Sequence, residues 1–218
     1  MKNKIIFIFI FAAISAAGIA GLIFAMQKGT KSIPTIRLAT ELITESQSKE
    51  ELEKLTVQPQ KTTSQSTLMD TAYFSFVIPD GWQEADASNT LPITITDSRE
   101  KLTNNKAKEM NFRTNISINS VELGETLFKN YVEDTKTRLI QAIPIIEITK
   151  EEGYAINGKE AHYMEIKSVQ NDLKFNTIVI LAVGKDNTVW AFSFNTLEES
   201  RLDYKDIFSN MIKSIKMK

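Results

Sequence analysis

A single histidine carries most of the acid–base chemistry that this sequence could offer at neutral pH. His162 is the only histidine among 218 residues, and the chain contains no cysteine. Metal sites built from histidine and cysteine, and nucleophiles activated by a histidine, would all depend on this one side chain. His162 also alternates with Met164 and Ile166, as residues on one face of a strand do. We therefore expect a structural histidine, and we predict no catalytic residue, no metal and no cofactor.

The motifs that hold phosphates or activate hydrolytic nucleophiles are missing from the sequence. Residues 157–161 read NGKEA, which has the Gly-Lys pair of a P-loop without its earlier glycine or its Ser/Thr. Neither His-Glu-x-x-His nor Gly-x-Ser-x-Gly occurs. The formal net charge of -1 also provides no basic field to attract nucleic acid. The sequence therefore favours a protein that is not an enzyme and does not bind nucleic acid.

Charged residues gather in the segment from Asp97 to Met110, between two predicted strands. Its basic residues are Arg99, Lys101, Lys106 and Lys108. The segment offers little to a core apart from Leu102, and loops of this length are uncommon unless they are disordered or bind something. We predict that it contacts a protein partner through these basic residues, which would mainly set the association rate and its salt dependence. A mobile insertion without a role is the alternative.

Three aromatic residues suggest a second kind of function. Trp82, Trp190 and Phe194 could line a pocket for a small apolar ligand between the sheet and the helices, which would make the protein a carrier or sensor. For Trp82 the competing interpretation is a lid over the end of the core. An internal cavity would favour the carrier, and a filled core with one exposed patch would favour a partner-binding domain.

Apolar residues recur at fixed periods from about residue 70 onward, which indicates where the folded domain begins. We predict strands over residues 73–78, 92–98 and 111–120, a helix over 125–142, four strands within 145–195, and a closing helix that Thr196 caps. In the third strand, Ser117 and Asn119 fall on a face that we expect to be half exposed. This order predicts an α+β domain with a mostly antiparallel sheet of about six to seven strands, packed by helices in an α/β/α sandwich.

Two turns are marked clearly by their residue types. The strand over residues 73–78 must end at Pro79, because proline cannot donate to a ladder, and the Asp80-Gly81 pair that follows is typical of a turn. This turn would position Trp82. Asn157-Gly158 is the strongest hairpin signal in the chain, since both residues of a tight two-residue turn require a positive φ.

The N-terminal part of the chain predicts a membrane anchor followed by a stalk. After Lys2 and Lys4, residues 5–26 form a run of 22 residues without a charge. As a helix this run would be about 33 Å long, enough to span a bilayer. We expect residues 1–26 to stay as an anchor with the N-terminus in the cytoplasm and the domain outside it; a cleaved signal peptide and a secreted protein are the alternative. Residues 27–69 lack aromatic residues and read as a polar stalk.

Residues 70–218 resemble the PsbP-like family. The resemblance rests on YFSFVIPDGW at 73–82, INGKEAHYMEIKS at 156–168, VWAFSF at 189–194 and DIFSNMIKSIKMK at 206–218. It implies an antiparallel sheet between helical layers, and its best-known member is a non-catalytic subunit that supports the oxygen-evolving photosystem. That role does not carry over to this chain, because the anchor, the stalk and the single histidine depart from it. No functional residue of the family has a motif here to which it could be assigned.

Overall fold

The computed structural model describes residues 66–85 and 93–218. The predicted anchor and most of the predicted stalk lie outside the described residues. Within the described ranges, no helix is both long enough and apolar enough to cross a membrane.

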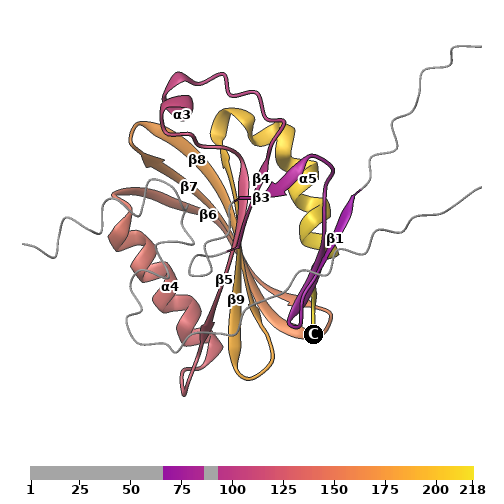
Figure 1. Cartoon of the computed structure of the whole chain (residues 1–218). Coiled ribbons are helices and arrows are strands. Elements are labelled where there is room, and N and C mark those ends of the chain that lie inside the picture. Colours follow the sequence, from indigo (N-terminus) through magenta and orange to yellow (C-terminus); the bar gives the residue numbers. More distant parts are fainter. Residues whose placement is uncertain (1–65, 86–92) are drawn as a thin grey trace, which may run out of the picture.

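A seven-stranded antiparallel sheet forms the centre of the domain (Figure 1). Its strands are β3 (Trp82–Glu84), β4 (Ile93–Asp97), β5 (Asn115–Glu122), β6 (Ile145–Ile156), β7 (Lys159–Gln170), β8 (Leu173–Val183) and β9 (Thr188–Leu197). Their order across the sheet is β3-β4-β5-β9-β8-β7-β6. Strands β6 to β9 lie side by side in sequence order, so they form the predicted meander. Asn157 and Gly158 adopt φ values of 39° and 83° in the β6–β7 turn, which confirms the hairpin.

A second, three-stranded sheet joins the two ends of the described chain. It consists of β1 (Thr67–Asp70), β2 (Phe74–Ile78) and β10 (Lys216–Met217), in the order β1-β2-β10. Residues 67–69 of β1 belong to the segment that composition assigned to the stalk. Their inclusion has a packing reason, because the side chain of Met69 is only 2% exposed.

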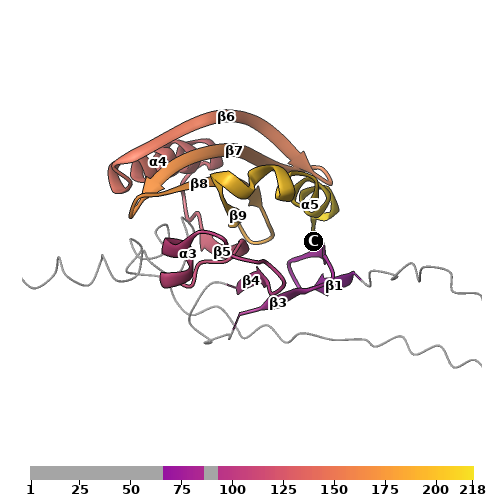
Figure 2. The ribbon, with the colours of Figure 1, turned by 90° about the horizontal axis from the view of Figure 1, so that it is seen from above.

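Two helices cover the large sheet from opposite sides, and a third, short helix lies beyond one end of it (Figures 1 and 2). They are α4 (Phe128–Ala142), α5 (Arg201–Ser214) and α3 (Asn105–Glu109). The prediction that Thr196 caps the closing helix is wrong. Thr196 lies within β9, where its hydroxyl is 3.0 Å from that of Thr114, and a 3₁₀ turn, Glu198–Ser200, precedes α5. The hydroxyl of Thr196 is therefore engaged between strands rather than at the helix terminus.

The turn after β2 places Trp82 in the core, as predicted. Gly81 has a φ of 83°, and the backbone N–H of Trp82 donates to the carbonyl of Pro79 at 3.2 Å. The ring of Trp82 meets those of Tyr204 and Phe208 nearly edge-on, with centroids 6.1 Å and 6.2 Å away. Trp82 thus begins β3 and packs against α5.

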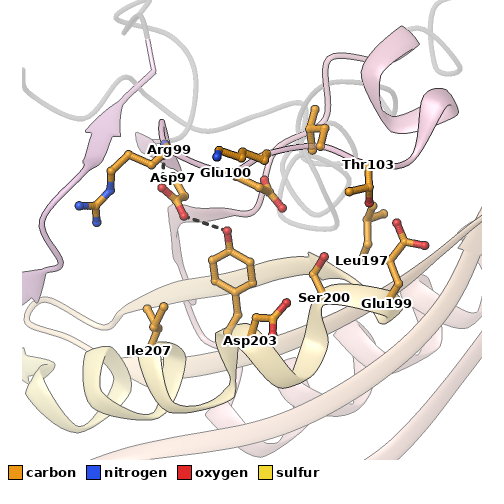
Figure 3. A pocket seen from close by; sticks show the side chains of 12 residues that line it. Asp97, Arg99, Glu100, Thr103, Leu197, Glu199, Ser200, Asp203 and Ile207 are labelled. Carbon is orange, nitrogen blue, oxygen red and sulfur yellow. Dashed lines mark hydrogen bonds between the residues drawn. The ribbon is translucent and has the colours of Figure 1, made fainter.

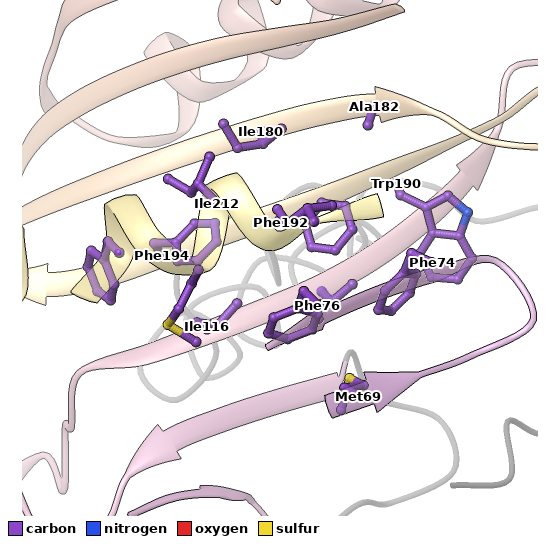
Figure 4. Close-up of a cluster of buried hydrophobic side chains, with 14 of the residues drawn as sticks. Met69, Phe74, Phe76, Ile116, Ile180, Ala182, Trp190, Phe192, Phe194 and Ile212 are labelled. Atoms are coloured by element: carbon purple, nitrogen blue, oxygen red, sulfur yellow. The ribbon is translucent and has the colours of Figure 1, made fainter. Parts of the chain in front are cut away.

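Aromatic rings fill the space between the large sheet, the small sheet and α5 (Figure 4). The buried rings include those of Phe74 and Phe76 from β2 and of Trp190, Phe192 and Phe194 from β9. Phe74 contacts Trp190 and Phe192 edge to face, with centroids 5.0 Å and 5.2 Å apart. The predicted shared face of the three β9 aromatics is confirmed, since all three are less than 5% exposed within this one cluster.

The opposite face of the sheet combines a mainly aliphatic cluster under α4 with a row of buried polar residues. Asn195 lies at the centre of this row: its Nδ2 donates to Oδ1 of Asn115 at 3.0 Å, and its Oδ1 accepts from Thr177 at 3.1 Å. The prediction of a half-exposed third strand is wrong here, because Ser117 and Asn119 are 1% and 9% exposed. The alternation of polar and apolar residues does not distinguish a solvated polar face from a buried one, because it reports the period of the strand and not what covers it.

Candidate functional site

A pocket of about 300 Å³ lies between residues 97–103 and the start of α5 (Figure 3). One wall is formed by the segment that leaves β4, and the other by the end of β9, the 3₁₀ turn and the first turns of α5. Carboxylates stand on both walls, at Asp97 and Glu100 on one side and at Glu199 and Asp203 on the other. The pocket is therefore a place where two segments distant in sequence meet and leave a space open to solvent.

Asp97 joins the two walls. Its Oδ2 accepts a hydrogen bond of 2.8 Å from the hydroxyl of Tyr204, and its Oδ1 accepts one of 2.9 Å from the backbone N–H of Arg99. Burial is the main cause that raises the pKa of Tyr204, and the hydrogen bond to Asp97 and the negative charge of Glu100 raise it further. Tyr204 is thus held in its neutral form and donates to Asp97 rather than acting as a phenolate.

Glu100 fixes the segment to the sheet behind it. Its two carboxylate oxygens accept from the backbone N–H of Thr114 at 2.6 Å and from the Thr114 hydroxyl at 2.8 Å. Arg113 adds a bond of 2.9 Å to the carbonyl of Glu100. Because Thr114 is fully buried, these bonds act as a structural anchor for the wall of the pocket.

The wall on the α5 side carries two carboxylates that accept no hydrogen bond from another side chain of the described residues. Glu199 and Asp203 are four residues apart, a spacing that places side chains on the same side of a helical segment. Within residues 66–85 and 93–218, neither takes part in an ion pair or a side-chain hydrogen bond, whereas the neighbouring Glu198 pairs with Lys167 at 3.1 Å. Apolar surface lies beside them, since Leu102, Leu197 and Ile207 also line the pocket. The pocket therefore presents carboxylates next to apolar walls.

The predicted partner-binding residues divide into two pairs. Arg99 and Lys101 line the pocket, and Arg99 also pairs with Asp80 at 3.0 Å and donates to its carbonyl. Lys106 and Lys108 instead lie on α3, outside the pocket, where Lys106 pairs with Asp172. The structure thus brings two of the four basic residues to the same site.

The segment 97–110 contributes more to the core than the sequence suggested. The side chain of Asn104 caps α3, with its Oδ1 accepting from the N–H groups of Lys106 and Ala107 at 3.0 Å and 3.1 Å. Ala107 is fully buried in a small cluster with Leu173 and Leu197. The expectation that only Leu102 would contribute is therefore wrong. An asparagine three residues before an alanine, ahead of lysines that favour helices, was the signal that could have indicated this helix.

The three aromatic residues proposed to line a ligand pocket do not do so. Trp82, Trp190 and Phe194 are 8%, 4% and 1% exposed, and all belong to the packed cluster between the sheet and α5. None of them lines the pocket described above. Trp82 and Phe194 both contact Phe208, whereas Trp190 lies against Tyr73.

His162 lies on the α4 side of β7, away from the pocket. Its Nε2 is 3.7 Å from Oε2 of Glu151, which in turn is 3.0 Å from Nζ of Lys136. Hydrogen bonds from Lys136 lower the pKa of Glu151, and the same contact raises the pKa of Lys136. In the described ranges, no group of three or more His, Cys, Asp or Glu side chains is placed to hold a metal ion. The surroundings of His162 are those of a charged surface cluster beside the helix.

Comparison with known proteins gives a likeness in fold. No protein-family model and no curated protein sequence matches the chain. Its structure is similar to the solution structure of cyanobacterial PsbP (CyanoP) from Synechocystis sp. PCC 6803, with a TM-score of 0.55, 14% identity, and coverage of 75% of this chain and 99% of that one. It also matches LpqN of Mycobacterium tuberculosis, described as involved in cell envelope biogenesis, with a TM-score of 0.46, 10% identity, and coverage of 72% of this chain and 87% of that one. The first of these likenesses supports a PsbP-like fold; at such low identity it concerns the fold alone.

Proposed function

We propose that this chain is a membrane-anchored extracytoplasmic protein with a non-enzymatic PsbP-like domain that binds a protein partner. Residues 5–26 would hold it in the membrane, and the partner would dock at the pocket between residues 97–103 and α5. The observation that carries the proposal is the pocket itself, which is open to solvent and has a firmly anchored wall.

The anchoring of that wall suits a docking surface. Asp97 is bonded to Tyr204, Glu100 to Thr114, and Arg99 to Asp80, so three contacts hold successive parts of the segment. A surface that is already ordered loses less conformational entropy when a partner binds. The segment can therefore present its exposed side chains in a fixed arrangement.

The bonds made by the same carboxylates are a reason to prefer binding over catalysis. An acid or base must reach its substrate with a free oxygen and change its protonation state during the reaction. Asp97 accepts from Tyr204 and Arg99, and both oxygens of Glu100 accept from Thr114. These oxygens are therefore already occupied by donors of the protein itself. The carrier alternative draws no support from Trp82, Trp190 and Phe194, because they pack in a filled core.

Site-specific photocrosslinking of the full chain in its own cells tests the docking site. A photoreactive phenylalanine derivative would replace Thr103, which lines the pocket, and in a second strain Asp186, in the turn at the far end of β9. We expect the Thr103 probe to capture a discrete neighbour that the Asp186 probe does not. Equal capture at both positions, or capture only at Asp186, would refute docking at the pocket.

Membrane fractionation tests the anchor separately. We expect the full chain to stay in the membrane fraction after a wash at high pH or high salt and to be released only by detergent, because residues 5–26 are long enough to span a bilayer. A mature chain that begins near residues 18–28 and is recovered in the soluble fraction would show that the segment is a cleaved signal peptide.

A further inference from the structure

We propose that the pocket receives a lysine or arginine side chain of the partner protein. This inference rests on the proposed function and adds the chemistry of the contact. The pocket has a carboxylate wall on α5, an apolar strip beside it and an aromatic residue at its base, and these three features together match a long cationic side chain.

The charges that line the pocket leave a negative excess. Asp97, Glu100, Glu199 and Asp203 contribute four negative charges, and Arg99 and Lys101 contribute two positive ones, so the lining sums to -2. Arg99 is already paired with Asp80, which stands outside the lining, so its charge is partly engaged away from the pocket. Charge complementarity therefore favours a cation in this space.

The two carboxylates on the α5 wall are the ones available to it. Glu199 on the 3₁₀ turn and Asp203 on α5 are not ion-paired within the described part of the chain, and both border the pocket (Figure 3). Asp97 and Glu100 across the gap are bonded to neutral donors, the Tyr204 hydroxyl and Thr114, so their negative charge is not cancelled by a cation. A guanidinium or ammonium group that enters the space would meet Glu199 and Asp203 on one wall, with Asp97 and Glu100 on the other.

The apolar residues of the pocket would contact the methylene groups of the bound lysine or arginine side chain. Leu102, Leu197 and Ile207 line the same pocket as the carboxylates. Lysine and arginine bury their methylene stems along apolar surface while the charged end reaches polar groups. The ring of Tyr204 also borders the space, and a cation can lie over such a ring. A metal ion would use the carboxylates but not the apolar strip, and a neutral apolar ligand would leave the carboxylates without partners.

The test adds short peptides to the full chain in detergent micelles and monitors binding through the NMR signals of residues that line the pocket. The probes are acetyl-glycyl-arginyl-glycine amide and its lysine analogue, with the citrulline analogue as a neutral control of nearly the same shape. We expect the cationic peptides to shift the signals of Glu199, Asp203 and Tyr204 with a Kd on the order of millimolar, as is usual for one anchoring side chain. The citrulline peptide should shift them little at the same concentration.

Matched variants locate the contact. Replacing both carboxylates as Glu199→Gln and Asp203→Asn should weaken binding of the arginine peptide about fivefold to tenfold, since each partly exposed charge pair contributes modestly. Glu109→Gln, at the exposed end of α3 and outside the pocket, should leave the affinity unchanged.

Equal binding of the citrulline peptide, or shifts that survive the double variant, would overturn the cationic contact. So would the absence of any pocket shift with the arginine and lysine peptides. If the Thr103 probe still captured a neighbour in cells, the docking site would stand and only the cationic contact would fail. If that capture failed as well, the proposed function itself would be refuted.

Discussion

The two faces of the seven-stranded sheet are closed in different ways. On the α5 side, aromatic rings of β2, β9 and α5 pack against one another, and Phe74 and Phe192 are fully buried. On the α4 side, one helix covers a mainly aliphatic cluster to which Phe128 and Tyr131 add rings, and the rest of the face carries polar side chains, several of them bonded around Asn195. The first face is sealed by segments from both ends of the described chain, and the second by a helix inserted between two of the sheet's own strands.

This difference predicts where stability resides. Aromatic side chains bury large areas and contribute most where several meet, so the α5 face should tolerate truncation poorly. On the α4 face, truncation of an aliphatic side chain should lower the free energy of unfolding more than removal of a side chain from the polar row. The four predictions below test this order, from the largest expected effect to the smallest.

Trp190→Ala should have the largest effect. The side chain is 4% exposed and contacts Tyr73 and Phe74, so its loss removes both buried area and ring contacts at the centre of the aromatic face. We expect the free energy of unfolding to fall by about 3–5 kcal/mol. Denaturant unfolding of the full chain measures this, with Tyr154→Ala as a control, because Tyr154 is 37% exposed on edge strand β6. A loss below about 1 kcal/mol for Trp190→Ala would contradict the packing.

Leu139→Ala probes the aliphatic cluster under α4. Leu139 is fully buried, whereas its neighbour Ile140 is 57% exposed on the same helix. We expect a loss of about 3 kcal/mol for Leu139→Ala and less than about 0.5 kcal/mol for Ile140→Ala. Thermal unfolding followed by circular dichroism compares the two. Equal losses would mean that α4 turns a different side toward the sheet.

Asn195→Ala and Ser193→Ala separate bonded from unbonded polar groups on the same strand. Asn195 bonds to Asn115 and Thr177, but the buried hydroxyl of Ser193 has no hydrogen-bond partner within the described residues. Removal of Asn195 should cost about 1–3 kcal/mol because it leaves its partners unsatisfied, and removal of the Ser193 hydroxyl should be neutral or stabilising. Chemical denaturation measures the free energy of unfolding of both variants. A larger loss for Ser193→Ala than for Asn195→Ala would contradict the hydrogen bonds described.

Tyr204→Phe tests the polar contact at the edge of the aromatic face through its pH dependence. The variant should lose about 1 kcal/mol at neutral pH, because one hydrogen bond to Asp97 disappears. Since the folded pKa of Tyr204 is raised above the ordinary tyrosine pKa of about 10, its contribution is fully present below about pH 10 and is lost as pH rises further. The wild type should therefore lose stability more steeply than the variant above pH 10. Parallel slopes in denaturant titrations between pH 9 and 11 would rule out this role.

The elements were predictable where one local pattern determines the structure. Alternation on β9 identified its buried aromatic face, and the stripe of α4 followed from helical spacing. Asn157-Gly158 identified a turn, because few residue pairs adopt its backbone conformation. In each case the information lies within a window of a few residues.

The pocket could not be predicted, because it forms between segments that are far apart in the sequence. The bond that closes its base joins Asp97 to Tyr204, which are 107 positions apart in the chain. Arg99 and Lys101 were identified as candidates by their charge, but no pattern in the sequence singled out Glu199 or Asp203 as site residues. β1 was missed because four residues with one buried side chain, Met69, carry no periodicity. Such features depend on contacts that form only when distant segments meet.

The small sheet also determines how the domain would bear mechanical load. The chain enters the described domain at Thr67, which pairs with Ile78 at the open end of the β1–β2 hairpin. Tension from the N-terminal side would therefore load this outermost pair first and separate the strands one pair at a time. At the far end of the hairpin, Lys218 bonds to Asp70 at 2.6 Å and its backbone N–H donates to Tyr73 at 2.9 Å. Lys218 thus holds the far end of the hairpin. A pulling force applied at Thr67 would reach the aromatic core at the third strand pair, where Met69 faces Phe76.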